Sequence, residues 1–309
     1  MRMGVDLGGT KIEAILMDRH DQVVQRKRVL TPKGNYHATM DKVRQLALEI
    51  EAMAGESCTI GIGIPGAISP VTGKVKNANS TCLIGHRLKE DLENLLARAI
   101  KVENDANCFA LSEALDGSGQ GASGVFGIIL GTGMGGGLVI KGQLVSGQNA
   151  IAGEWGHNPL PWPEREELPG PPCYCGKRGC LETLLSGPGM VQDHLRHAPS
   201  EASATLTAET LWQAAAQGEP HAKESVQRYQ SRLARSLASV VNLLDPDVIV
   251  LGGGLSNQKE LYQNLPGLIR PFVFSDRVTT QILPPQHGDS SGVRGAARLW
   301  PAEPVDPQG

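Results

Sequence analysis

Met3-Gly4-Val5-Asp6-Leu7-Gly8-Gly9-Thr10-Lys11 stands near the start of the chain, an apolar run interrupted by two glycines and a threonine. A second apolar run, Ile12 to Met17, follows directly, so the segment predicts two strands joined by a glycine turn. The pattern recurs in Val125 to Leu130, the turn Gly131-Thr132-Gly133 and the run Gly137 to Ile140. Two such units, each broken at Gly-Thr, predict a duplicated chain with two related halves.

Helical and extended patterns alternate between and after these units. Apolar residues recur with helical spacing over 40–54, 88–99 and 226–244, and the run 248–251 is typical of a strand. Strands that alternate with helices predict the α/β fold class. The glycine-containing stretch 116–119 predicts the boundary between an N-terminal lobe, residues 1–117, and a C-terminal lobe, residues 118–289.

The composition excludes several classes of protein. Apolar residues make up 40% of the 309 residues and charged residues 20%, as in globular rather than disordered chains. The net charge of −3 gives no general attraction to nucleic acid or to anionic membranes. No apolar run approaches the roughly 20 residues of a membrane helix, and the start lacks a secretory signal. We therefore expect a cytoplasmic protein with neither nucleic acid nor membrane as a partner.

A cluster of metal-ligating residues is the sharpest feature of the second half. Three of the six cysteines are closely spaced and follow a histidine: His157, Cys173, Cys175 and Cys180. Three thiolates and one imidazole complete the tetrahedral set of a closed, structural Zn²⁺ site. Glu154 and Glu182 flank these ligands, so a bound metal would also fix two carboxylates that accept hydrogen bonds from a polyhydroxylated substrate. The alternative is an ordinary structural histidine and two surface glutamates.

The two glycine turns are candidate phosphate sites. Asp6 ends a strand beside a turn whose backbone N–H groups could cradle phosphate oxygens while the carboxylate holds Mg²⁺. The alternative is a plain hairpin turn. The segment 131–136 matches the dinucleotide fingerprint G-x-G-x-x-G, which requires a helix directly afterwards. A strand-like run follows instead and favours a second phosphate-facing hairpin.

Asn104 and Asp105 stand between a short apolar stretch and a predicted helix. Aspartate at such a place is commonly a helix cap. At the carboxyl end of a strand, where open α/β sheets bind ligands, the same carboxylate could take a proton from an attacking hydroxyl.

Four motifs in order resemble the ROK family (repressors, open reading frames, kinases): 6–11, 104–107, Glu154-x-Gly-His157 and Cys173-x-Cys-Gly-x-x-Gly-Cys180-x-Glu182. The resemblance runs from residue 3 to residue 297. It implies an actin/hexokinase-like duplicated fold of ribonuclease H-like halves, with ATP and sugar in the cleft. It also implies a homodimer and a C-terminal helix, at about 290–302, that returns to the first lobe.

The resemblance further implies a role for each matching residue. Asp105 is the expected general base, and Asp6 is expected to help place Mg²⁺. The residues expected to hold sugar hydroxyls are Asn104, Asp105, Glu154, His157 and Glu182. The expected zinc ligands are His157, Cys173, Cys175 and Cys180. The residues expected to face ATP are Asp6, Gly9, Thr10, Lys11, Gly131, Thr132, Gly133, Gly253 and Gly254.

The substrate expectation rests on likeness within the family. Lys76 to Thr81 and Glu154 to Trp162 resemble bacterial fructokinases most, so we expect ATP-dependent phosphorylation of D-fructose to fructose 6-phosphate. The alternatives are glucose, mannose or N-acetylglucosamine. A ROK repressor would need a helix-turn-helix before the first glycine turn, and Gly8 leaves no room for one. The intact Asp105 disfavours a sugar sensor without catalysis.

Overall fold

The computed structural model describes residues 1–198 and 205–301 and contains two five-stranded sheets. The first has the order β3-β2-β1-β4-β7, formed by β1 (Arg2–Leu7), β2 (Lys11–Met17), β3 (Val23–Leu30), β4 (Thr59–Ile64) and β7 (Ile100–Asn104). The second has the order β10-β9-β8-β11-β12, formed by β8 (Gly124–Leu130), β9 (Met134–Ile140), β10 (Gln143–Val145), β11 (Val248–Gly252) and β12 (Gln281–Leu283). A small ribbon pairs β5 (Ala67–Ile68) with β6 (Val75–Lys76).

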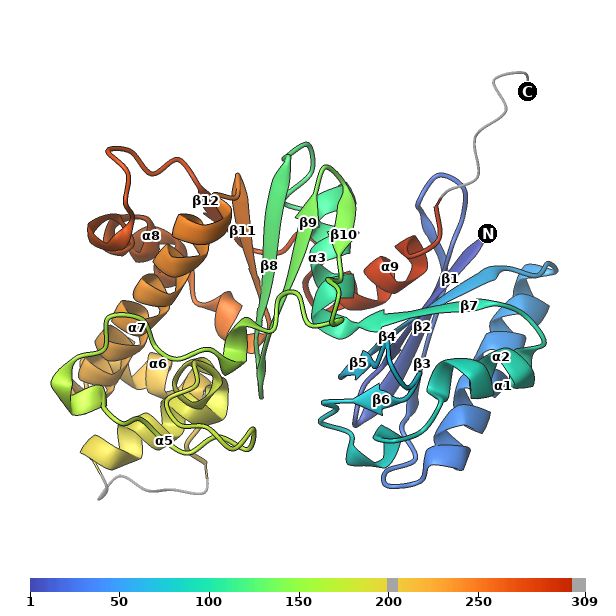
Figure 1. The fold of residues 1–309 in the computed structure, drawn as a ribbon, viewed down its shortest axis with the longest axis horizontal. Helices are drawn as coiled ribbons and strands as arrows, with labels where there is room; N and C mark the ends of the chain where they lie inside the picture. Colours follow the sequence, from blue (N-terminus) through green and yellow to red (C-terminus); the bar gives the residue numbers. More distant parts are fainter. Residues whose placement is uncertain (199–204, 302–309) are drawn as a thin grey trace.

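The two sheets share one topology. In each, the first three strands of the chain are antiparallel neighbours, and the last two are parallel to the first. This confirms the predicted duplication and the two-lobed α/β fold, whose lobes lie side by side in Figure 1. β9 is antiparallel to β8, so the turn at 131–133 leads into a strand, and the prediction against a dinucleotide-binding helix is confirmed.

Nine α-helices accompany these strands in the described ranges 1–198 and 205–301. They are α1 (Tyr36–Ala54), α2 (Leu88–Leu96), α3 (Asp105–Asp116), α4 (Glu182–Leu185), α5 (Gly187–His197), α6 (Ala208–Ala216), α7 (Pro220–Leu244), α8 (Lys259–Leu268) and α9 (Ser291–Arg298). None of them, within those ranges, is both long and apolar enough to cross a membrane.

Local signals set the ends of these elements. Asn35 caps α1 by accepting the backbone N–H of Ala38, and Gly55 ends it in the left-handed conformation at φ 74°. α2 ends before Ala97, at φ 53°, and is therefore shorter than the spacing predicts. α7 begins earlier than predicted because the carboxylate of Glu219 accepts two N–H groups of its first turn.

Helices α3 and α9 lie between the two sheets and pack against each other (Figure 1). α9 packs on β1 and β4 of the first sheet, and α3 packs on β8 and β9 of the second. Two glycines permit α9 to approach its neighbours, Gly4 on the side of β1 and Gly295 on the side of α3. A Cβ on Gly4 would come within 2.0 Å of the Val293 carbonyl oxygen, and one on Gly295 within 1.7 Å of the Cys108 carbonyl oxygen. The predicted lobe boundary at 117/118 stays a prediction, because α3 contacts elements of both lobes.

Glu113 on α3 ties together the two segments that connect the lobes. Its carboxylate is fully buried and accepts the backbone N–H groups of Ser118 and Gln286, at 2.9 and 3.0 Å. It also accepts the hydroxyl of Ser291 at 2.6 Å. Ser118 follows α3, and the other two residues precede or begin α9. The segment after α3 and the segment before α9 are therefore both hydrogen-bonded to the Glu113 side chain.

Candidate active site

Asp105 is the first residue of α3, at the point where the chain leaves β7. Asn104 caps the helix, because its side-chain oxygen accepts the N–H groups of Ala106 and Asn107 at 2.9 and 3.2 Å. The Asn104 amide in turn donates to the Gly66 carbonyl at 3.1 Å. The Asp105 carboxylate lies at the strand end and accepts the Ala106 N–H at 2.8 Å.

The surroundings of Asp105 keep its carboxyl ready to exchange a proton near neutral pH. Burial, with a further contribution from the negative charge of Glu154, raises the pKa of Asp105 from 3.8 to about 6. Burial and the charge of Asp105 likewise raise the pKa of Asp6 from 3.8 to about 7. The two aspartates therefore lie close enough to repel each other. A divalent cation would offset that repulsion.

A cavity opens in front of Asp105 and is lined mostly by polar groups. Its space of about 190 Å³ equals roughly six water molecules at ~30 Å³ each, which suits one small polyhydroxylated molecule. The polar side chains that line it are Asn77, Asn79, Asn104, Asp105, Asn107, Thr132, Glu154, His157, Tyr174 and Glu182. Every sugar-binding residue predicted from the sequence is among them.

The two predicted glutamates are held differently. Glu182 begins α4, and its carboxylate accepts the Met134 N–H at 2.8 Å. A Cβ on Gly133 would lie 2.9 Å from that carboxylate, so a larger residue there would shift the Glu182 side chain. No side chain or backbone group of the described residues hydrogen-bonds the Glu154 carboxylate, and burial together with the charge of Glu182 raises the pKa of Glu154. Its free oxygens are thus available to accept hydroxyl groups inside the cavity.

The predicted metal ligands come together. The ligand atoms of His157, Cys173, Cys175 and Cys180 all lie within 4.8 Å of one another. His157 Nδ1 is 3.5 Å from Cys173 Sγ, and Cys175 Sγ is 3.6 Å from Cys180 Sγ. A tetrahedral Zn²⁺ with Zn–S near 2.3 Å separates its ligand atoms by about 3.5–3.8 Å. The donor set is therefore compatible with a structural zinc ion.

His157 faces both sites. Its Nδ1 lies beside the cysteine sulfurs, and its Nε2 lies 2.9 Å from the Tyr174 hydroxyl at the cavity wall. A metal on Nδ1 would fix the ring and direct Nε2 toward the cavity. Tyr174, between two of the cysteines, belongs to the same wall.

A second, more open cavity of about 750 Å³ shares Gly131 and Thr132 with the first. Its other walls come from 187–192 on α5, from 206–209 and from 254–258 after β11. Gly254 lines it, and Gly253 approaches β8 so closely that a Cβ there would lie 2.4 Å from the Leu130 oxygen. The turn at 131–132 thus connects a small polar cavity with a larger one that is open enough for a nucleotide.

The first glycine turn lines a separate space. Gly9 and Thr10 border a cavity in the first lobe that shares only Asn79 with the polar one. Lys11 is exposed, and Asp6 borders none of these three cavities. The structure therefore does not bring the two predicted phosphate turns to one cavity.

Comparisons with known proteins decide the family. The profile of the ROK family matches residues 2–303. The chain belongs to the ROK family. The N-acetyl-D-glucosamine kinase of Yersinia pseudotuberculosis serotype O:1b (strain IP 31758) is 41% identical over 98% of this chain and 100% of its own length. The N-acetyl-D-glucosamine kinase of Vibrio cholerae serotype O1 is 41% identical over 97% of this chain and 99% of its own.

Solved structures of ROK enzymes share the whole architecture. A ROK hexokinase from Thermus thermophilus matches with a TM-score of 0.84 and 30% identity over 96% of both chains. A ROK glucokinase from Streptomyces griseus, in complex with glucose and AMPPNP, matches with a TM-score of 0.78 and 30% identity. It covers 96% of this chain and 98% of its own. These matches confirm the actin/hexokinase-like fold expected for the ROK chain.

Sequence reasoning missed part of the cavity wall of this ROK protein. Asn77 and Asn79 follow β6, and Gly66 follows β4. Both asparagines lie in the stretch 76–81 that resembles fructokinases, but asparagines carry no distinctive spacing, so neither was assigned to the site. Tyr174 could have been noticed, since it lies between two expected zinc ligands.

Proposed function

We propose that this ROK sugar kinase transfers the γ-phosphoryl group of ATP to the 6-hydroxyl of N-acetyl-D-glucosamine. The carrying observation is the 41% identity, over nearly the full length of both chains, to proteins named N-acetyl-D-glucosamine kinase. These relatives support the alternative, N-acetylglucosamine, rather than the expected fructose. Both the fructose and the N-acetylglucosamine hypotheses require phosphorylation of a sugar by ATP.

The cavity in front of Asp105 supports an amino-sugar acceptor. N-Acetylglucosamine differs from glucose by an acetamido group, whose methyl favours an apolar neighbour. The Ile151 side chain lines the cavity and is 44% exposed, so it offers an aliphatic surface. Glu154 and Glu182 offer carboxylate acceptors to ring hydroxyls.

The chemical step follows from the position of Asp105. Its carboxylate accepts the proton of the sugar hydroxyl, the oxygen attacks the γ-phosphorus, and ADP leaves. Such proton transfer contributes about 10²- to 10⁴-fold to the rate. The turn at Gly131 and Thr132 lies between the two cavities. The Gly131 N–H donates to the Gly133 carbonyl within the turn, so the Thr132 N–H is the donor suited to the phosphate chain that passes between the cavities.

Two metal ions have distinct roles in this proposal. Mg²⁺ would neutralise phosphate charge, and Asp6 is the carboxylate expected to help hold it, directly or through water. Zn²⁺ on His157, Cys173, Cys175 and Cys180 would stabilise the wall of the cavity without entering the reaction.

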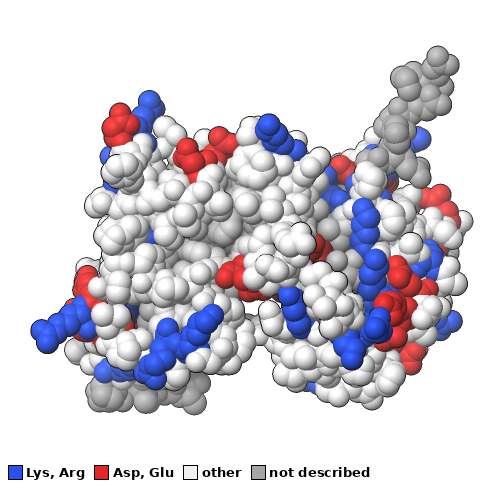
Figure 2. All heavy atoms as spheres, viewed as in Figure 1, with Lys and Arg blue, Asp and Glu red and all other residues white. Residues whose placement is uncertain are grey.

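A cytoplasmic homodimer stays our prediction. On the face in Figure 2 basic and acidic side chains are interspersed, with no single-sign patch suited to a nucleic acid.

A sugar panel tests the proposal. Initial rates of ADP formation should be measured with N-acetylglucosamine, fructose, glucose and mannose, each over a full concentration range. We expect kcat/KM for N-acetylglucosamine to exceed every other value by at least tenfold. A higher kcat/KM for fructose would overturn the substrate assignment, and no turnover with any sugar would overturn the proposed kinase activity.

A further inference from the structure

The segment 158–172 separates His157 from the three cysteines of the expected zinc set. It is mostly exposed, as its proline and acidic content predicts, and apart from the short 3₁₀ turn Arg165–Glu167 it has no helix or strand. Such a loop would be costly to close, because bringing its ends together restricts many backbone conformations. Two isolated bridges, Pro159 with Cys180 and Pro172 with Arg178, pair the ends of the loop, and its middle needs contacts of its own.

Glu167 is the buried charge of this segment, with a side chain only 6% exposed. Arg235 donates two parallel hydrogen bonds to the Glu167 carboxylate, Nη1 to Oε2 and Nη2 to Oε1, both at 2.8 Å. Arg232 donates a third, from Nε to Oε1, at 2.8 Å. Arg235 Nη1 also donates to the Trp162 carbonyl at 2.6 Å, so one guanidinium holds the loop at two points.

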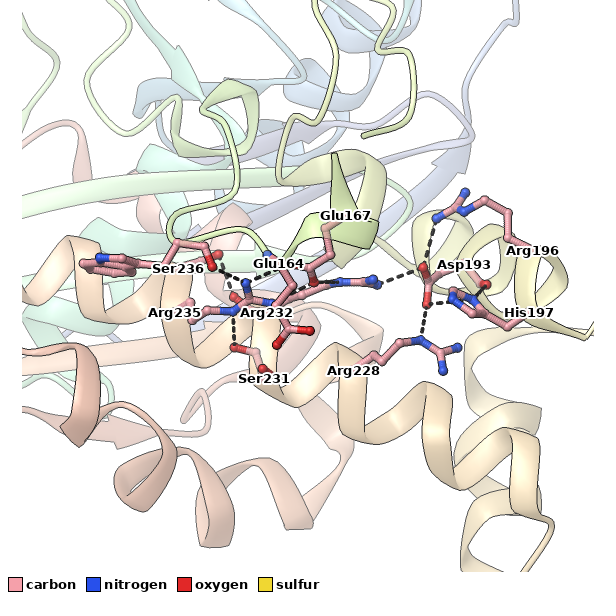
Figure 3. A network of polar contacts seen from close by, with 11 residues as sticks. Glu164, Glu167, Asp193, Arg196, His197, Arg228, Ser231, Arg232, Arg235 and Ser236 are labelled. Carbon is pink, nitrogen blue, oxygen red and sulfur yellow. Dashed lines mark hydrogen bonds and ion pairs between the residues drawn. The ribbon is translucent and has the colours of Figure 1, made fainter. Parts of the chain in front are cut away.

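The arginines that hold Glu167 are themselves fixed. Both belong to α7, the longest helix of the described residues, and their side chains are 3% and 6% exposed. Arg232 Nη1 also reaches Asp193 on α5, at 2.9 Å. Figure 3 shows its guanidinium lying between the two carboxylates. Asp193 is paired with Arg228 Nε as well, at 3.0 Å. The loop is thus attached to a rigid pair of helices.

The charges of this network favour the ionised form of Glu167. Burial alone would raise its pKa, but the hydrogen bonds from Arg235 and Arg232 and from the Glu164 N–H outweigh burial and lower the pKa to about 2. The carboxylate therefore remains charged, and the attachment remains intact, throughout the range in which a kinase works.

We propose that Glu167 is a positioning residue. Its hydrogen bonds to Arg232 and Arg235 order segment 158–172 before the metal binds, and so hold His157 beside the cysteines for zinc. Its consequence for the cavity rests on the proposed function: because His157 Nε2 faces the cavity, a loose loop should weaken sugar binding. Gly131, Thr132 and the α5 residues that line the larger cavity make no hydrogen bond or ion pair to segment 158–172 in the described ranges, and α5 is linked to the loop only through Asp193 and Arg232. ATP binding should therefore be spared.

The test compares Glu167→Ala and Glu167→Gln with two matched controls. Arg228→Met removes a guanidinium from the same network on the Asp193 side, without touching the loop. Leu265→Ala removes a fully buried side chain of α8 and supplies a stability loss unrelated to the network. The readouts are zinc affinity, from competition with a chromophoric chelator, the KM for sugar and the KM for ATP, and the melting temperature.

We expect Glu167→Ala to weaken zinc affinity by about 10- to 100-fold, as for other partners that orient metal ligands. The KM for sugar should rise by a similar factor, the KM for ATP should stay within about twofold, and Glu167→Gln should fall between. Arg228→Met and Leu265→Ala should match the wild type in zinc affinity. If Glu167→Ala fails to fold, Glu167→Gln carries the comparison.

Three results would overturn the inference: a wild-type chain that binds no zinc, unchanged zinc affinity in both Glu167 variants, or an equal loss in Leu265→Ala. If the wild type binds zinc and the Glu167 variants lose it while no sugar is phosphorylated, the inference holds and the proposed function fails. The two hypotheses are therefore separable.

Discussion

Asp105→Asn should make the protein more stable while it abolishes turnover. The substitution keeps the size of the side chain and an oxygen that can accept the Ala106 N–H, but it removes the ionisable group. The proposed base is lost, so phosphoryl transfer should stop while sugar binding persists. If Asp105 served only to stabilise the start of α3, Asp105→Asn would instead make the protein less stable.

The magnitude follows from the raised pKa of Asp105. A rise from 3.8 to about 6 means that ionisation costs about 3 kcal/mol more in the folded than in the unfolded chain. Water in the cleft screens part of this, so we expect about 1–3 kcal/mol. At an unfolding entropy of about 2.1 cal/mol/K per residue, this corresponds to roughly 2 to 5 °C.

The sign of the effect depends on pH in a defined way. Well below pH 4 the carboxyl is protonated in both the folded and the unfolded chain, so wild type and Asp105→Asn should melt together. Between about pH 4 and pH 6 the unfolded wild type releases this proton while the folded wild type keeps it, so the wild type loses stability relative to the variant as pH rises. Above pH 6 the difference should be constant.

Differential scanning calorimetry from pH 4 to pH 8 measures this difference, with ADP formation measured alongside. Asp276→Asn, the same change at an exposed aspartate, is the control and should leave the melting temperature unchanged at every pH. Equal melting temperatures for wild type and Asp105→Asn across the range would refute the electrostatic reasoning. Near-normal turnover in Asp105→Asn would refute its role as the base.

Further predictions follow from single contacts. In the wild type, kcat/KM should fall about tenfold per pH unit below about pH 6, as Asp105 becomes protonated; a profile flat to pH 5 would contradict this. Ile151→Ser should lower the preference for N-acetylglucosamine over glucose about fourfold, the value of one buried methyl near 0.8 kcal/mol; an unchanged ratio of kcat/KM values would show that Ile151 does not face the acetamido group. Cys175→Ser should remove bound zinc, measured by mass spectrometry under native conditions, and retention of a full equivalent would exclude Cys175 as a ligand. Glu113→Gln should lower the free energy of unfolding by about 3 kcal/mol in urea titrations, because an amide cannot accept all the donors that face the carboxylate; a loss below 1 kcal/mol would contradict the reading.

The sequence predicted the architecture because the decisive signals are local. The two strand–turn–strand units depend on runs of apolar residues and on Gly-Thr breaks, and both appear where expected. What remained hidden was the contact between α3 and α9, since it joins residues far apart in the chain. Gly295 makes that contact possible, and Gly4 lets α9 approach β1, but a glycine in a sequence does not reveal which backbone approaches it.

The candidate site was predictable where chemistry restricts the residue type. Cysteine spacing identified the metal set, and the carboxylates at 105, 154 and 182 lie around one cavity. Asn77 and Asn79 escaped notice because amides occur in many ordinary turns. Glu167 looked like one acid among several in an exposed loop, and only the three-dimensional structure shows Arg232 and Arg235 closing around it.

One competition experiment tests the central claim most directly. The protein is supplied with ATP and equal concentrations of N-acetylglucosamine, fructose, glucose and mannose. The phosphorylated products are separated by anion-exchange chromatography, identified against standards, and the phosphate is located by phosphorus–proton coupling. The account predicts N-acetylglucosamine 6-phosphate as the main product, absent when Asp105→Asn replaces the wild type. A predominance of fructose phosphate, or the same product mixture from Asp105→Asn, would contradict it.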